Sequence, residues 1–148
     1  RVLTSHDAKE SCGYHITTAD KRRCALVTDT GFLTQDALSA LCDSNAVIIE
    51  SNHDLQMLKN GPYPFTLKKR VMSMTGHLSN DDCAKVLPTL VESGVTRFLL
   101  AHLSQENNTP RLALETSKIA LNSAGMIENE DYTIMTAPPE TTGKTVIF

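Results

Sequence analysis

The chain has 148 residues and a formal net charge of -3, with 41% hydrophobic and 21% charged residues. This composition fits one globular domain and excludes a disordered or collagen-like chain. The longest apolar runs, AVII and FLLA, are far shorter than the roughly 20 residues of a membrane helix, so no membrane span is predicted.

The first part of the chain is predicted to be rich in strands. RVLTSHD at the start resembles a strand with a polar tip, and YHITT and RRCALVTDTG form a hairpin through the turn ADKR. TQDALSALCDSN predicts a short amphipathic helix with Thr34 as its N-cap. AVIIE is nearly all apolar, which is typical of a strand covered on both faces. Residues 51–77 give no clear pattern, because a short helical piece is followed by a Gly-Pro-Tyr-Pro break.

The second part alternates helices with strands. SNDDCAKVLPTLVESG predicts a helix with Ser79 as its N-cap and Gly94 as its stop, and Pro88 should kink it or mark a boundary. VTRFLLAHLS is a buried strand, and NNTPRLALETSKIALNSAG predicts a helix capped by Thr109. DYTIMTA and TVIF are predicted to be short strands. The order predicts an α/β fold with a mixed sheet and covering helices.

The spacing of the four cysteines indicates the redox state of the cellular compartment. Cys12, Cys24, Cys42 and Cys83 lie far apart without a C-x-x-C pair, so neither a zinc ribbon nor a disulfide framework is indicated. We expect reduced, mostly buried thiols in a cytoplasmic protein. The chain begins with Arg1 instead of methionine, and we expect it to be part of something longer.

Three polar side chains follow predicted strands, where a sheet commonly presents its ligand-binding groups. They are His6 in TSHD, Asp29 in VTDTG and His102 in LAHLS, and His77 adds a fourth just before a helix start. Imidazole and carboxylate ligands suit a divalent metal such as zinc, and a carboxylate can bridge two ions. Without a contiguous metal motif, however, surface or turn roles are the more common explanation for each residue alone.

A resemblance changes this balance. SHDAKESCGY, VTDTG, IIESNHDLQML, GPYPFTLKKRV, GHLSNDD and LAHLSQENNTP occur in the order found in metallo-β-lactamase-fold hydrolases of the YycJ (WalJ) type. The resemblance covers nearly the whole chain and implies the C-terminal half of a four-layer αββα sandwich. It also implies that His6 binds one divalent ion, His102 binds a second, and Asp29 bridges them. The ions would be zinc or manganese.

The resemblance further implies substrate-side roles. His77 corresponds to a histidine near the scissile phosphate that acts as an acid or as an oxyanion-stabilising donor. His53 is expected to support the site or face the substrate. Exposed N–H groups at the helix start of Ser79 would favour an anion. The chain also has a basic run, Lys68, Lys69 and Arg70. These residues could contact a nucleic-acid backbone, or they could form a solvated helix face.

The family signature His-x-His-x-Asp-His is absent, so residues 1–148 are interpreted as one partial domain. Each ion would keep only two protein ligands, fewer than the three usual for catalytic zinc. We therefore expect weak metal binding, no hydrolysis by the chain alone, and self-association or pairing with the missing half. For the parent protein a nuclease, specifically a DNA exonuclease, is favoured. The alternatives are hydrolysis of a small ester or cyclic phosphodiester, or a non-catalytic binding or assembly module.

Overall fold

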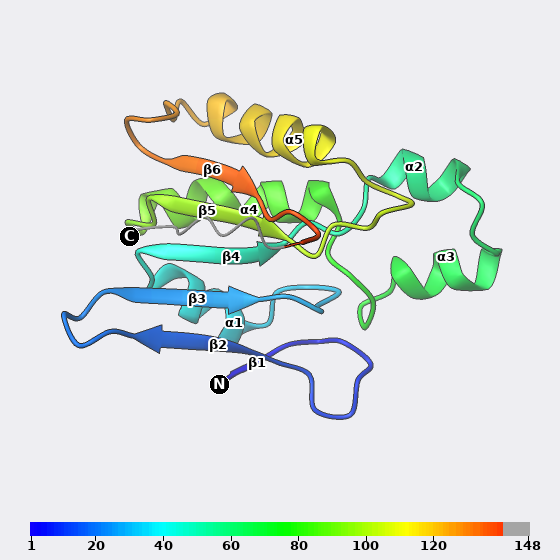
Figure 1. Ribbon diagram of the computed structural model, residues 1–148, viewed down its shortest axis with the longest axis horizontal. Helices are drawn as coiled ribbons and strands as arrows, with labels where there is room; N and C mark the ends of the chain where they lie inside the picture. Colours follow the sequence, from blue (N-terminus) through cyan, green and yellow to red (C-terminus); the bar gives the residue numbers. More distant parts are fainter. Residues whose placement is uncertain (141–148) are drawn as a thin grey trace.

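A computed structural model describes residues 1–140 and has one mixed six-stranded sheet with strands in chain order (Figure 1). The strands are β1 (Val2–Leu3), β2 (Cys12–Thr17), β3 (Arg23–Val27), β4 (Ala46–Glu50), β5 (Arg97–Ala101) and β6 (Thr133–Thr136). β1, β2 and β3 pair antiparallel, whereas β3, β4, β5 and β6 are parallel. The predicted α/β class with a mixed sheet is thus confirmed.

Five helices connect the strands. They are α1 (Gln35–Cys42), α2 (Leu55–Asn60), α3 (Phe65–Val71), α4 (Asn80–Glu92) and α5 (Pro110–Ser123). Figure 1 shows α1 and α4 behind the sheet, α5 beside β6, and α2 and α3 beyond the carboxyl ends of the parallel strands. The core lies between the sheet and α1, α4 and α5, where Leu41, Leu87, Ile49, Leu100 and Leu121 are fully buried.

The predicted helix ends are confirmed by their caps. The side chains of Thr34, Ser79 and Thr109 each accept a hydrogen bond from a backbone N–H three residues ahead, as N-cap residues do. Gly94 and Gly125 follow α4 and α5 with φ of 104° and 81°, a left-handed conformation that glycine adopts without strain.

One prediction about local structure needs correction, and another is not tested. Pro88 does not end a helix, because α4 runs through it without interruption and buries Leu87 and Leu90 on either side. Packing of these neighbours offsets the lost backbone hydrogen bond. The predicted strand TVIF falls within residues 141–148, outside the described part of the chain.

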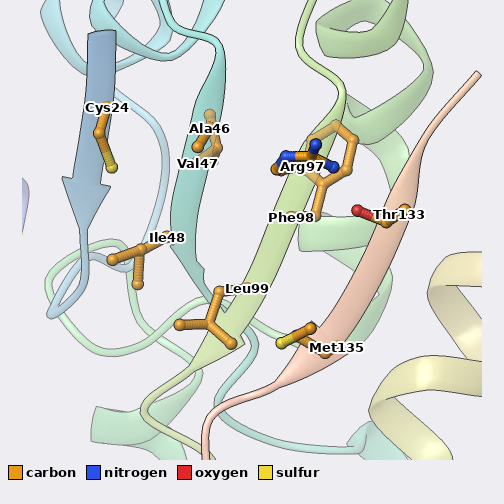
Figure 2. Close-up of a pocket in the computed structure, with 9 residues that line it drawn as sticks. All are labelled: Cys24, Ala46, Val47, Ile48, Arg97, Phe98, Leu99, Thr133 and Met135. Atoms are coloured by element: carbon orange, nitrogen blue, oxygen red, sulfur yellow. The ribbon is translucent and has the colours of Figure 1, made fainter. Parts of the chain in front are cut away.

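Only one face of the sheet is covered by the described residues. Val47 and Ile49 of β4 are buried, but Ile48 between them is only half-buried, so the expectation of a strand covered on both faces is not met here. Ile48 lines a shallow apolar pocket with Leu99 and Met135 (Figure 2). Among residues 1–140, no helix is long and apolar enough to cross a membrane.

Candidate metal centre

The carboxyl ends of the three central parallel strands meet at one edge of the sheet and carry acidic and imidazole side chains. Asp29 follows β3, Glu50 ends β4 and His102 follows β5, while His77 comes from the loop between α3 and α4. One ligand atom from each of these four side chains lies within 4.8 Å of the others. This is the edge at which parallel α/β sheets usually bind their ligands.

Glu50 lies at the centre of this group and is fully buried. Its Oε1 atom lies 2.6 Å from His102 Nδ1 and 2.9 Å from His77 Nδ1. Its Oε2 atom accepts hydrogen bonds from the backbone N–H groups of Thr30, at 2.9 Å, and Leu78, at 3.2 Å. Both oxygens are therefore already engaged, and Glu50 is better suited to orient the two imidazoles than to bind an ion itself.

The electrostatics of the site favour an ionised Glu50. Burial raises the pKa of this carboxyl group, but hydrogen bonds from His102, His77 and the N–H of Thr30 outweigh it and lower the pKa to about 2. The same hydrogen bond to Glu50 raises the pKa of His102. Because an ionised carboxylate only accepts hydrogen bonds, both Nδ1 atoms carry a proton. In the neutral ring of His102 the Nε2 lone pair is then free to act as a ligand.

Asp29 and His102 both hold an unusual backbone conformation. Their φ angles are 55° and 56°, in the left-handed region that non-glycine residues rarely occupy. His102 Nδ1 lies 3.7 Å from Asp29 Oδ1. Left-handed non-glycine residues cost free energy and cluster at functional sites, where surrounding contacts hold them in place.

His6 joins the group from the loop after β1. The centroid of its ring lies 4.8 Å from that of His77, which in turn lies 5.1 Å from that of His102. His6 Nδ1 lies 3.2 Å from both the Ala8 nitrogen and Asp7 Oδ1. The three histidines thus form a row across the strand ends.

These side chains line one cavity of about 300 Å³. Its polar walls are His6, Asp29, His77, His102 and Arg70. The predicted meeting of His6, Asp29 and His102 at one rim of the fold is therefore found in the structure. Their roles as metal ligands, and that of His77 as a donor, stay predictions.

Of the three predicted basic contacts, only Arg70 lines the cavity. Its guanidinium donates to both oxygens of Asp7, at 2.8 and 3.1 Å, and this pairing fixes it beside His6. The ammonium of Lys68 donates to the carbonyl of Lys59, and that of Lys69 lies 5.7 Å from the ring centroid of Phe65. Lys68 and Lys69 therefore do not line this cavity.

His53 and Ser79 lie behind the site instead of at its surface. His53 is 1% exposed, and burial lowers the pKa of its ring. Of its two predicted roles, this placement favours support over substrate contact. Ser79 and Asn80 are buried, and the N–H of Asn80 donates to the carbonyl of His53. The helix start is thus not exposed to an anion as expected, because it packs against the β4 loop.

Sequence reasoning missed Glu50. A signal was present, since Glu50 is the one charged residue of an otherwise apolar strand, and a buried charge needs partners. Those partners are 27 and 52 residues away in the sequence, so the carboxylate could be flagged from the strand but its contacts could not.

Comparison with known proteins agrees with a candidate metal site at the strand ends. The arrangement of acids and imidazoles at the strand ends is that of an α/β protein with a candidate metal site. The particular proteins that the chain resembles are exodeoxyribonucleases. It is 35% identical over 136 residues to exodeoxyribonuclease YycJ of Bacillus anthracis, and 34% identical over 137 residues to exodeoxyribonuclease WalJ of Streptococcus pneumoniae. The predicted resemblance to the YycJ (WalJ) type is confirmed.

These matches cover most of this chain but only part of each relative. They cover 92% and 93% of this chain but 51% of each relative, so the chain spans about half the length of the curated relatives it matches. No family model matches the chain.

Proposed function

We propose that this chain carries part of the metal-dependent phosphodiesterase centre of a DNA exonuclease. The observation that carries the proposal is the cavity in which His6, Asp29, His77 and His102 meet around the buried Glu50. The similarity to YycJ and WalJ supports DNA as the substrate. Residues 1–148 would then be the C-terminal half of a four-layer αββα sandwich, as one partial domain.

The donor set fits divalent ions. In this proposal His6 would hold one ion, His102 would hold the second, and Asp29 would contribute to both. When bound, two zinc or manganese ions would supply an acidified water and neutralise charge on the phosphate. The free Nε2 atom of His102 is the ligand expected of an imidazole whose other nitrogen is held by a carboxylate.

His77 and Arg70 act on the phosphate itself. Glu50 holds His77 by its Nδ1 atom, and His77 lines the cavity. In the proposal its ring is protonated on both nitrogens when the phosphate binds, and Nε2 gives its proton to the leaving oxygen. Arg70, fixed by Asp7, presents its positive charge to a phosphate oxygen in the same cavity.

The ligand set within the chain is incomplete. Each ion would have two protein ligands here, whereas catalytic zinc usually has three. We propose that the chain alone binds ions weakly and is inactive, and that the remaining half of the protein supplies the other ligands. That half would also cover the open apolar face beside Ile48 (Figure 2). The four free thiols support a reducing, cytoplasmic setting.

The open face and the incomplete ligand set also favour a second candidate, a non-catalytic assembly module that associates with another copy of itself. Hydrolysis of a small ester or cyclic phosphodiester stays a further alternative, and it would need a closed pocket in place of an extended path.

A complementation assay tests the main proposal. The chain is co-expressed with the half of Bacillus anthracis YycJ that the alignment leaves unmatched, the complex is isolated, and degradation of end-labelled DNA is followed with manganese. We expect digestion from a strand end by the complex and by a Lys69→Ala control, and its loss with Asp29→Asn or His77→Ala. An isolated complex that degrades DNA equally well with Asp29→Asn would refute the assignment.

A further inference from the structure

His102 lines two cavities. The first is the cavity of about 300 Å³ that contains His6, Asp29 and Arg70. The second, of about 530 Å³, lies between the loop that follows β5, the start of α5 and the segment after β6. Because the two cavities share His102, they are neighbours, and a ligand that binds in the first could reach towards the second.

The two cavities differ in charge. The first has a carboxylate, a guanidinium and imidazoles in its walls. Apart from His102 at its rim, the second has no ionisable side chain among the described residues. Its apolar walls are Leu103, Pro110, Pro138 and Pro139, and its polar groups are the hydroxyls and amides of Ser104, Thr109, Gln105 and Asn108.

The wall of the second cavity is rigidly built. The side-chain amide of Asn108 donates to the carbonyls of Ser51, at 2.8 Å, and Asn52, at 3.0 Å. The N–H of Ser104 donates to Asn52 O at 2.8 Å, and the Asn52 amide donates to His102 O at 2.8 Å. These bonds tie the wall to the strand ends that carry the candidate metal ligands, so the cavity is formed before a ligand arrives.

We propose that the second cavity is a nucleoside subsite, which takes the base and sugar next to the phosphate held in the first cavity. This inference rests on the function proposed above. Apart from His102, the described walls contain no group that can carry a positive charge, which disfavours a phosphate there, whereas proline rings offer a flat apolar surface to a base. The volume lies within the range of small-molecule sites. Gln105, which is exposed and lines the cavity, has both donors and an acceptor for the edge of a base.

The test uses the full chain without added metal, with thymidine as the probe. Binding is followed by NMR, with dissociation constants from titration. We expect thymidine to bind and to shift the backbone amide signals of Leu103, Ser104 and Thr109. Gln105→Ala should weaken thymidine binding about 3- to 10-fold, the effect of one lost hydrogen bond.

Gln56→Ala is the matched control, because Gln56 is exposed on α2 and lines neither cavity. It should leave thymidine binding unchanged. The subsite is refuted if thymidine does not bind, if its signals map elsewhere, or if both variants bind it equally. Thymidine carries no phosphate and the assay contains no metal, so failure of the proposed hydrolase activity would appear separately, in the complementation assay.

Discussion

Asp29 and His102 meet across the ends of β3 and β5 with nearly equal left-handed backbone angles, 55° and 56°. Their side chains approach to 3.7 Å between Oδ1 and Nδ1. The chain thus places two strained residues side by side at the point where a metal-binding carboxylate and imidazole are proposed. Strain of this kind indicates that Asp29 and His102 are needed for where their side chains lie, and not for the stability of the fold.

Substitutions at Asp29 should separate stability from metal binding. A left-handed conformation costs roughly 1 kcal/mol or more for a residue with a Cβ atom and little for glycine. We expect Asp29→Gly to be more stable than Asp29→Ala by about 1 kcal/mol in urea unfolding, while both lose metal affinity. Equal stability of the two variants would show that the backbone at Asp29 is not strained.

Removing the charge of Glu50 should damage both the fold and the site. Glu50→Gln keeps the size of the side chain but cannot accept all four hydrogen bonds, so we expect a loss of about 2 kcal/mol or more in the free energy of unfolding. Metal affinity should fall about 10- to 100-fold, because the imidazoles lose their orienting partner. Calorimetric titration measures this, with the exposed Glu92→Gln in α4 as control. If Glu50→Gln binds metal as tightly as the wild type, Glu50 does not orient the metal ligands.

The same carboxylate predicts how stability depends on pH. The pKa of Glu50 falls from 4.5 to about 2 on folding, so the unfolded chain binds its proton first as the pH drops. The stabilisation from Glu50 is complete above pH 4.5 and is lost as the pH falls from 4.5 towards 2.

Comparison of wild type with Glu50→Gln isolates this effect from other acids. The difference in their free energies of unfolding should shrink between pH 5 and pH 2. Urea unfolding across this range measures it, and a difference that stays constant with pH would contradict an ionised Glu50 in the folded chain.

The open sheet face predicts self-association of the chain when it is alone. Ile16 of β2 is 55% exposed and Met135 of β6 is 47% exposed, on strands at the two sides of the sheet. Ile16→Lys should reduce the mass measured by light scattering towards that of a monomer. The control is Ile119→Lys on α5, where an isoleucine is 66% exposed away from the sheet. A wild-type chain that is monomeric at high concentration would contradict the prediction.

The sequence allowed the fold class to be predicted because local signals mark most elements. Thr34, Ser79 and Thr109 are N-caps in the sequence and in the structure. Residues 51–77 were harder to interpret. Asp54 is the N-cap of α2, but α3 has no side-chain cap hydrogen bond and buries none of its residues, so neither a cap nor a buried apolar face marks it.

The site was predictable in part. The rule that ligands gather at strand ends made His6, Asp29 and His102 candidates, and the resemblance was needed to favour a shared metal site. It did not reveal Glu50, whose hydrogen bonds join distant parts of the chain. It also left the burial of His53 unpredicted, because burial depends on how α4 packs against the loop after β4.

Metal titration of the chain alone tests the central claim most directly. Cobalt binding, followed by its visible absorption, should be weak in the wild type, fall at least tenfold more in His102→Ala and Asp29→Asn, and stay unchanged in the Lys69→Ala control. Cobalt binding that is equal in all four proteins, or two tightly held ions per wild-type chain, would contradict a half-complete centre built on His6, Asp29 and His102.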